Sequence, residues 1–286
     1  MEEALALLQK TVYSFSMNVC GQREDAEDTM QEVLFKSVPY LSRFDSPRAL
    51  LVWLFKVAKN RCLMSRRRSK FAPKSALSLE ELMPNRRELQ SLSVQHEGTP
   101  ETTLLRRENA KRLRDAVRKL PPEYRLILVL HDMEELSDTD ISEITGLRLG
   151  TIRVRLHRAR LFVRKELAAR DGSGMGRHAR GRSEARQIPP QPRGRNCKAM
   201  FAELSNYLDE ALDDSLCEEL EKHMDGCEPC KAFLLSLENS IHQCREASRE
   251  TPDPHAAAKL RRELISEYHE LMADISKIGQ AKARRS

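Results

Sequence analysis

The sequence predicts an all-α protein in which a linker joins two small helical domains and a small cysteine-containing helical domain follows. Apolar residues recur at helical spacing in residues 1–70 and again in residues 104–169. A stretch rich in Gly, Pro and Arg, residues 171–196, separates these blocks from the third. Charged residues make up 32% of the 286 residues and aromatic residues only 5%, which is typical of a mostly helical chain with defined linkers.

The composition favours nucleic acid as a partner. The formal net charge is +6 and the isoelectric point is near 9.0. A merely basic protein is the alternative at this level. No apolar run approaches the ~18–20 residues that span a membrane, and the N-terminus lacks the apolar core of a signal peptide. We therefore expect a soluble, cytoplasmic protein.

The cysteines favour metal or thiol redox chemistry in a reducing compartment. Their number is odd, and five of the seven follow residue 196. The chain is long and shows no signal peptide, which argues against a secreted disulfide framework. The seven are Cys20, Cys62, Cys197, Cys217, Cys227, Cys230 and Cys244.

The first block, residues 1–70, carries three apolar helical stripes. Between residues 71 and 103 the chain becomes polar and contains three prolines, which predicts a linker with one short helix around LSLEEL, residues 77–82. The stripes are Leu5, Leu8 and Val12; Val33 and Val38; and Leu50, Leu54 and Val57.

The second block, residues 104–170, ends in a pattern typical of a helix-turn-helix. Ser137 is a predicted N-cap with Asp140 three residues later, and Gly146 supplies a left-handed residue that ends the helix, with Leu147 packing the turn. A second helix is predicted to begin near Gly150. Its inner stripe is Ile152, Leu156, Ala159 and Val163, and its outer face is Arg153, Arg155, His157, Arg158 and Arg160.

The basic outer face and the glycine turn together predict DNA binding. A charge run alone is usually a solvated surface, but here it falls on the second helix of a helix-turn-helix. Arginines near the start of such a helix can pair with guanine edges, and later ones suit phosphates.

An apolar stretch, residues 124–131, precedes the helix-turn-helix. Its periodicity does not separate a buried helix from a strand. Pro121 and Pro122 followed by Glu123 favour the start of a helix.

The end of the chain is divided by composition. Residues 171–196 predict a disordered basic tether, and residues 197–245 a third compact block. Residues 255–278 predict an amphipathic helix, which either packs on that block or forms part of a surface that binds the earlier domains. Its apolar positions are Leu260, Leu264, Leu271, Ile275 and Ile278.

Within the third block, the stretch HMDGCEPC is compatible with a metal site, a redox switch or an ordinary helix end. His223, Cys227 and Cys230 supply three soft donors, and Cys197 begins a helical segment 26 residues earlier. A Cys₃His set suits tetrahedral Zn²⁺, and four protein ligands close the site to catalysis. We therefore predict a structural zinc site, in which oxidation of the thiolates would release the metal.

The residues of the first two blocks resemble a known family. LPPEYRLILVLHDMEELSDTDISEITGLRLGTIRVRLHRAR is similar to region 4 of the extracytoplasmic-function (ECF) sigma factors of the sigma-70 family, which reads the −35 promoter element. DAEDTMQEVLFKS, residues 25–37, resembles the region 2 helix that docks on the β′ clamp of RNA polymerase. WLFKVAKNRCLMSRRR, residues 53–68, resembles the helix that melts and reads the −10 element.

The resemblance assigns roles by position. It implies core polymerase contacts on the β′ clamp and the β flap, promoter DNA as a partner, and capture of a flipped −10 base by the loop 40–47. The implied clamp residues are Asp28, Gln31 and Glu32. The implied −10 residues are Asn60, Arg61, Arg66, Arg67 and Arg68. The implied −35 residues are Arg153, Val154, Arg155, His157 and Arg158.

Two departures from the family pattern leave the promoter sequence open, and the place of Trp53 is a separate question. Met64 stands where the family usually has Asp, and Val154 stands where a small polar residue is common. An outward Val154 would suit a thymine methyl group; otherwise it is buried. Trp53 either stacks on DNA or belongs to the core, and a lone Trp on a helix is more often core.

The third block resembles the zinc-binding anti-sigma domain, with Tyr207, Leu208 and Asp209 matching its Tyr-Leu-Asp. That domain is normally a separate protein that covers the polymerase-binding faces of regions 2 and 4. Here it is fused behind the sigma regions. The resemblance implies a non-enzymatic sigma factor regulated in cis by its zinc domain, through metal or oxidant, or one with a passive zinc domain.

Two other classes of protein are alternatives to this interpretation. A helix-turn-helix regulator that is not a sigma factor would leave the two region 2 motifs unexplained. A metalloenzyme is disfavoured by the closed ligand set and by the lack of a Ser/His/Asp or paired-carboxylate constellation.

Overall fold

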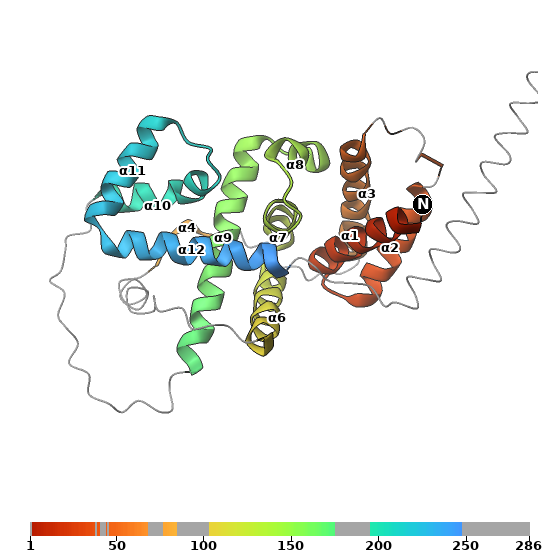
Figure 1. The fold of residues 1–286 in the computed structure, drawn as a ribbon, viewed down its shortest axis with the longest axis horizontal. Coiled ribbons are helices and arrows are strands. Elements are labelled where there is room, and N and C mark those ends of the chain that lie inside the picture. Colours follow the sequence, from red (N-terminus) through yellow and green to blue (C-terminus); the bar gives the residue numbers. More distant parts are fainter. Residues whose placement is uncertain are drawn as a thin grey trace, which may run out of the picture. The chain divides into compact units, whose positions relative to one another are not determined.

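The computed structural model describes residues 2–37, 39–40, 44, 46–67, 77–84, 103–174 and 195–247. Every regular element within these ranges is a helix, so the all-α prediction is confirmed (Figure 1). The chain divides into two compact units. Unit 1 contains Met1–Pro73 and Glu134–Arg148, and unit 2 contains Lys74–Met133 and Leu149–Ala247. The boundary between them falls inside the helix-turn-helix.

Unit 1 is built on three helices whose apolar faces meet. They are α1 (Glu2–Cys20), α2 (Arg23–Ser37) and α3 (Pro47–Arg67). Gly21, at φ 81°, ends α1, and a left-handed backbone there favours glycine because it has no Cβ. Phe15 of α1 and Phe55 of α3 are fully buried, with ring centroids 4.8 Å apart. Of the predicted apolar stripe of α1, Leu5 and Val12 are buried and Leu8 is half-buried.

Unit 1 also contains α8 (Asp138–Thr145), the first helix of the helix-turn-helix, which lies against α3. Lys59 of α3 donates from Nζ to the carbonyl of Ile144, 2.6 Å away, at the C-terminal end of α8. At the other end of α8, Arg48 forms an ion pair with Asp140. A cation at a helix C-terminus and a carboxylate in the first turn both suit the helix dipole.

Four elements of unit 2 pack together. They are α6 (Thr103–Lys119), α7 (Pro122–Leu128), a π-helical turn η2 (Val129–Met133) and α9 (Leu149–Gly174). The buried Arg125 closes the end of α6: its Nε donates to the carbonyl of Val117 (3.1 Å) and its Nη2 to that of Leu120 (2.9 Å). These bonds satisfy carbonyls that a helix end leaves without intrahelical partners. The apolar stretch 124–131 is thus a buried helix and turn, which settles the ambiguity with a strand.

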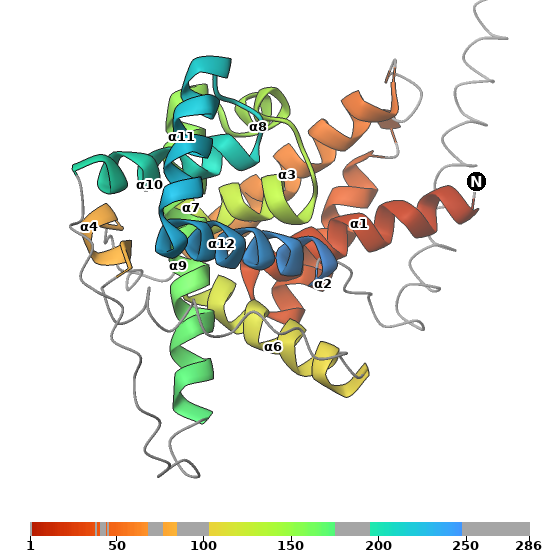
Figure 2. The same cartoon turned by 60° about the vertical axis from the view of Figure 1, so that its left-hand side comes forward.

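The rest of unit 2 is a C-terminal block of α10 (Arg195–Leu208), α11 (Asp214–Gly226) and α12 (Glu228–Ala247), with the short helix α4 (Leu79–Leu82). Helix α12 crosses α9 and α6, as both ribbon views show (Figures 1 and 2). One apolar core joins them. It contains Leu82 of α4, Leu161 of α9, Met200, Phe201 and Leu204 of α10, Leu220 of α11, and Cys230, Phe233, Leu237 and Ile241 of α12.

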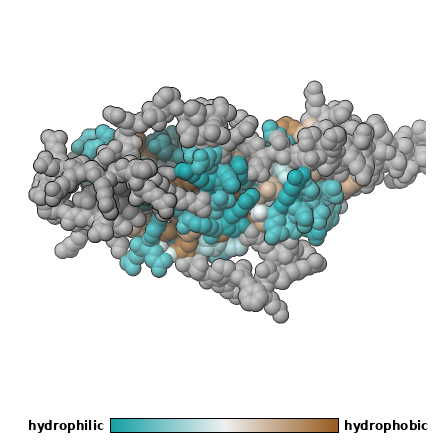
Figure 3. Space-filling model, turned by 90° about the horizontal axis from the view of Figure 1, so that it is seen from below, coloured by the Kyte–Doolittle hydropathy of each residue, from teal (hydrophilic) through white to brown (hydrophobic). Residues whose placement is uncertain are grey.

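Several predicted boundaries compare closely with the structure. The short helix within LSLEEL is present as α4, and α9 continues to Gly174, beyond the predicted end at residue 170. At the other end of the predicted tether, α10 begins at Arg195, two residues before the predicted third block. Residues 175–194 of that tether and the predicted amphipathic helix 255–278 lie outside the described residues. On the face shown in Figure 3 the described surface is mainly hydrophilic. Among the described helices none has the length and apolarity to cross a membrane.

Candidate functional site

The predicted clamp-binding residues lie on the outer face of α2. Asp28 and Gln31 are exposed and Glu32 is half-buried. Lys36 donates from Nζ to Glu32 Oε1 (2.6 Å), and Arg61 Nε lies 2.8 Å from Glu32 Oε2. The Lys36 hydrogen bond, with the Arg61 charge, lowers the pKa of Glu32 despite slight desolvation. Glu32 is therefore charged and tied to α3, whereas Asp28 and Gln31 face solvent.

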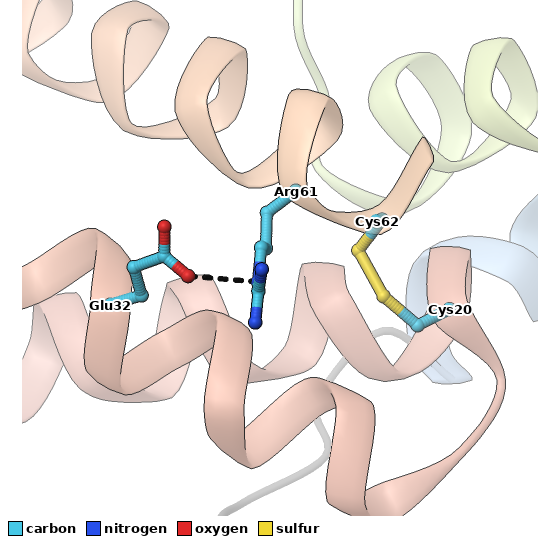
Figure 4. Close-up of a disulfide and its surroundings, with 4 residues drawn as sticks. All are labelled: Cys20, Glu32, Arg61 and Cys62. Carbon is cyan, nitrogen blue, oxygen red and sulfur yellow. Dashed lines mark ion pairs between the residues drawn. A yellow bond between two sulfur atoms is a disulfide. The ribbon is translucent and has the colours of Figure 1, made fainter. Parts of the chain in front are cut away.

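The predicted −10 residues lie along the C-terminal half of α3. Asn60 is exposed, and the half-buried Arg61 reaches across to Glu32 (Figure 4). Arg66 and Arg67 belong to the last turn of α3, but their side chains lie outside the described part of the chain, as does all of Arg68. The structure thus brings one predicted −10 residue against one predicted clamp residue.

Beside Arg61, Cys62 forms a disulfide with Cys20, the last residue of α1 (Figure 4). Their Cα atoms are 5.5 Å apart, although 42 positions separate them in the sequence, and both side chains are buried. This pair departs from the expectation that the cysteines serve metal or free-thiol chemistry. The packing of α1 on α3 brings the two together, and spacing along the chain gives no sign of it.

Three aromatic rings gather where the loop 40–47 meets α3. Trp53 is half-buried, with its ring centroid 5.8 Å from that of Tyr40 and 5.7 Å from that of Phe44. Offset contacts at these distances are favourable. Trp53 therefore packs within the protein, as the sequence favoured, while Tyr40 is exposed beside it.

The first helix of the helix-turn-helix has the predicted ends. The Ser137 hydroxyl accepts from the Asp140 backbone N–H (3.2 Å) and donates to the Asp140 carboxylate (2.6 Å). Gly146 has φ 74° and its N–H donates to the carbonyl of Ser142 (2.8 Å). The predicted cap and left-handed turn are both confirmed. The second helix, α9, begins at Leu149, one residue before the predicted start.

The two faces of α9 are only partly as predicted. Its four inner-stripe residues are buried, Arg153 and Val154 are exposed, and Arg155 and Arg158 are half-buried. The prediction that His157 and Arg160 face outward is wrong in this structure, because α10 of the C-terminal block covers that side of α9. His157 is 7% exposed and Arg160 only 1%. The DNA-reading roles of the α9 residues stay predictions.

Arg160 lies between two carboxylates. Its Nε and Nη2 donate to Asp132 of η2 (2.9 and 2.6 Å), and its Nη1 and Nη2 donate to Asp209 at the end of α10 (2.7 and 2.8 Å). Burial alone would raise the pKa of Asp132, but the charge and hydrogen bonds of Arg160 outweigh it and hold that pKa well below its usual range. Burial likewise opposes the charge on Arg160, but the two carboxylates raise its pKa.

His157 lies one helical turn before Arg160 and faces the same block. Its Nδ1 is 2.8 Å from the hydroxyl of Ser205 on α10. Burial, with the charges of Arg160 and Arg158, lowers the pKa of His157 to about 4. The imidazole is therefore neutral at physiological pH while α10 covers it.

The predicted metal ligands meet where α11 ends and α12 begins. The donor atoms of His223, Cys227 and Cys230 all lie within 4.8 Å of one another. Cys230 Sγ is 3.3 Å from both Cys227 Sγ and His223 Nε2. Two thiolates on one tetrahedral zinc, each at about 2.3 Å, would be roughly 3.7 Å apart. One imidazole and two thiols at this spacing fit a zinc ion.

Cys197, the fourth predicted ligand, lies in the first turns of α10, and its side chain is outside the described part of the chain. The two remaining cysteines of the block do not join the cluster. Cys217 is half-buried on α11, and Cys244 is buried on α12, where burial above all raises the pKa of its thiol above the ordinary value. A buried protonated thiol is a poor metal ligand.

Three family models match the chain in the order of its blocks. Residues 5–71 match sigma-70 region 2, residues 110–163 match sigma-70 region 4, and residues 197–231 match a zinc-finger family. The two sigma matches cover α1–α3 and the elements from α6 into α9. The zinc-finger match contains all four predicted metal ligands.

Curated relatives agree with these matches. The chain is 30% identical over 156 residues to the ECF RNA polymerase sigma factor SigW of Bacillus subtilis, covering 54% of this chain and 82% of that relative. It is 30% identical to the sigma factor SigE of Mycolicibacterium smegmatis over 55% of this chain and 57% of that relative. It is 28% identical to the sigma factor YlaC of B. subtilis over 50% and 78% of the two chains.

A helix-turn-helix behind a region 2 helical unit defines a sigma factor, a transcription initiation factor with no enzymatic activity. The chain belongs to the ECF family of sigma factors. The alternative of a helix-turn-helix regulator of another class is thereby set aside. RNA polymerase and promoter DNA are the partners that this family implies.

Two groups of residues in the site were missed from sequence. The first is the disulfide pair of Cys20 and Cys62. The second is the contact of Arg160 with Asp209 and of His157 with Ser205. Asp209 belongs to the Tyr-Leu-Asp motif, but its partner lies 49 residues earlier on another helix, and a single sequence offers no signal for such a pairing.

Proposed function

We propose that this sigma factor holds itself in an inactive form by docking its C-terminal block on α9 of region 4. The observation that carries the proposal is the burial of one whole side of α9. His157, Arg160 and Arg164 follow one another at helical spacing and are each at most 7% exposed, under α10 and α12. A helix that reads the −35 element needs its polar side open to DNA.

The contact has the chemistry of a specific interface. Apolar Leu161 of α9 belongs to the same core as Met200, Phe201 and Leu204 of α10. The guanidinium of Arg164 stacks 4.2 Å from the ring centroid of Phe233 on α12, a cation–π arrangement. An apolar centre with aromatic and arginine anchors is typical of interfaces that bind well.

Fusion makes even a weak contact effective. The predicted tether of about 26 residues would span ~25–30 Å if flexible, and such linkers give effective concentrations around millimolar. With an interface of micromolar affinity, roughly 999 chains in 1,000 would be closed. Opening the chain to even odds would then require about 4 kcal/mol.

We propose that zinc controls this balance. His223, Cys227, Cys230 and Cys197 would hold the metal, and the metal would supply the cross-link between α10 and the α11–α12 junction. Structural zinc provides much of the folding free energy of small units of this kind. Loss of zinc, or oxidation of its thiolates, would therefore loosen the block and expose α9.

The open chain would use the surfaces that the family resemblance assigns. Asp28, Gln31 and Glu32 would contact the β′ clamp, and region 4 would contact the β flap. Asn60, Arg61 and Arg66–Arg68 would read the −10 element. Arg153, Val154, Arg155, His157 and Arg158 would read the −35 element. The exposed Val154 and Arg153 support this last assignment, since both already face solvent.

Run-off transcription with core polymerase tests the proposal. A protease site placed within residues 175–194 lets the full chain fold before the tether is cut. At nanomolar protein, cleavage should release the block and raise promoter-specific transcription by a large factor, and micromolar free block should suppress it again. The matched control is the same chain incubated with inactivated protease. Equal transcription before and after cutting would mean that the block is a passive appendage.

A further inference from the structure

Arg160 uses all of its hydrogen-bonding capacity in this structure. A guanidinium has five N–H donors in a fixed plane. Two go to Asp132, two to Asp209, and Nη1 also lies 3.4 Å from the carbonyl oxygen of Ser205. Three of the five donors are thus directed to α10 of the C-terminal block.

The two carboxylates around Arg160 differ in kind. Asp132 is fully buried in η2, next to the start of the helix-turn-helix, and it fixes one edge of the guanidinium. Asp209 is 18% exposed at its side chain and belongs to the block that the proposed function removes. Once that block leaves, Asp132 would still orient Arg160, and three N–H groups would point outward without their present acceptors.

Such an outward fork is suited to an oxyanion. The planar guanidinium binds carboxylate and phosphate in the same two-pronged way, and a fork that is already oriented loses little entropy on binding. Arg158, two residues earlier on α9, is half-buried and carries a further positive charge on the same helix. On a helix that enters the major groove, late arginines commonly hold the phosphate backbone.

We infer that the outer edge of Arg160 is a DNA phosphate-binding site, which Asp209 occupies in the closed chain. This inference rests on the proposed function and adds a mechanism to it. In the closed chain, the carboxylate of Asp209 takes the position that a DNA phosphate would take in the open chain. Promoter DNA and Asp209 then compete for the same three donors. The block is displaced more easily by a polyanion than a purely apolar cover would be.

Salt dependence of DNA binding by the full chain provides the test. The affinity for a 30-base-pair duplex is measured over a range of KCl concentrations for the wild type and for Asp209→Asn. The matched control is Glu210→Gln, which makes the same change in charge at the next, exposed residue. Asp209→Asn should bind more tightly and with a steeper salt slope, by about 0.9 per phosphate gained. Glu210→Gln should behave as the wild type.

A third variant isolates Arg160. Replacing Arg160 alone would leave Asp132 buried without a partner, so Asp132→Asn and Arg160→Gln are combined in the Asp209→Asn chain, and its folding is checked by thermal unfolding. The slope should fall back by about 0.9, and the affinity by about tenfold.

The possible failures separate the two proposals. If Asp209→Asn binds DNA more tightly but the Arg160 substitution leaves the slope unchanged, the phosphate site is wrong and the block acts by covering alone. If Glu210→Gln steepens the slope as much as Asp209→Asn, general repulsion explains the effect and the site is again wrong. If cutting the tether leaves transcription unchanged, the proposed function itself fails.

Discussion

The two compact units hold their helices together by different chemistry. In unit 1, a disulfide between Cys20 and Cys62 joins α1 to α3 around a core made by the region 2 helices themselves. In unit 2, region 4 shares its core with the C-terminal block, and two thiols of that block, Cys227 and Cys230, gather at a candidate metal site. Unit 1 is therefore stabilised by contacts among the region 2 helices, whereas one side of α9 is covered by a block that we propose can undock.

Removal of zinc should have the largest effect, and only on unit 2. We expect one zinc per chain, and Cys227→Ser or His223→Ala should lose it. Zinc binding supplies about 10–16 kcal/mol in zinc-finger peptides, so the block should loosen while unit 1 stays folded. Elemental analysis and hydrogen exchange measure the two effects.

Cys217→Ser is the control for the metal site, because Cys217 lies outside the cluster on α11. It should retain full zinc. A Cys197→Ser/Cys227→Ser double variant that still holds one zinc per chain would contradict the ligand set.

The buried ion pair of unit 2 gives the next largest effect. Asp132→Ala leaves Arg160 charged and buried with only Asp209 as a carboxylate partner, and breaking a buried pair costs about 3–5 kcal/mol. Chemical denaturation followed in unit 2 measures the loss. Glu218→Ala, which breaks the exposed pair with Lys222, is the matched control and should cost less than ~1 kcal/mol. Similar losses in both variants would contradict the role given to burial.

Local features of this molecule could be predicted from the sequence. The Ser137 cap, the Gly146 turn and the inner stripe of α9 each depend on a few neighbouring residues whose preferences agree. The metal triad was also predictable, because His223, Cys227 and Cys230 lie within eight residues of one another and chain geometry keeps them close.

Contacts between distant segments could not be predicted in this way. Helical periodicity placed His157 and Arg160 on the outer face of the second helix, and the structure buries both. Their burial follows from docking of α10, whose Ser205 and Asp209 lie more than 40 residues away. The same reason applies to Cys20 and Cys62, and to the contact of Lys59 with the end of α8.

The disulfide predicts an effect of reduction on unit 1 alone. Reduction with dithiothreitol should destabilise unit 1 by roughly 2–4 kcal/mol, because a closed loop of this length restricts the unfolded chain. Unit 2 should show no shift beyond any effect of the reductant on zinc, which is checked by metal content. The Cys20→Ser/Cys62→Ser variant should unfold at the same denaturant concentration with and without reductant. A wild type that is equally insensitive would show that the bond does not stabilise unit 1.

The smallest expected effect is a pH dependence of docking that comes from His157. Its pKa is about 4 under the C-terminal block and would return toward the ordinary 6.5 when α10 leaves. Because the docked state binds fewer protons, docking is at full strength above pH 6.5 and weakens as the pH falls toward 4. With these two values as limits, the weakening between pH 7.5 and 5.5 is at most about 1.3 kcal/mol, or roughly tenfold in the affinity of the cut block for the rest of the chain, because the charges of Arg160 and Arg158 stay beside His157 in the open state. Calorimetric titration at each pH measures this affinity, with zinc content verified at every point so that metal loss is not mistaken for protonation.

The affinity of the cut block for the His157→Gln chain should not change with pH in this window, because glutamine can still bond Ser205 but does not titrate. A His131→Gln chain should keep the dependence, since His131 lies beside Asp132 on the region 4 side. A wild-type affinity that is constant from pH 7.5 to 5.5 would mean that the neutral His157 does not contribute to closing the chain.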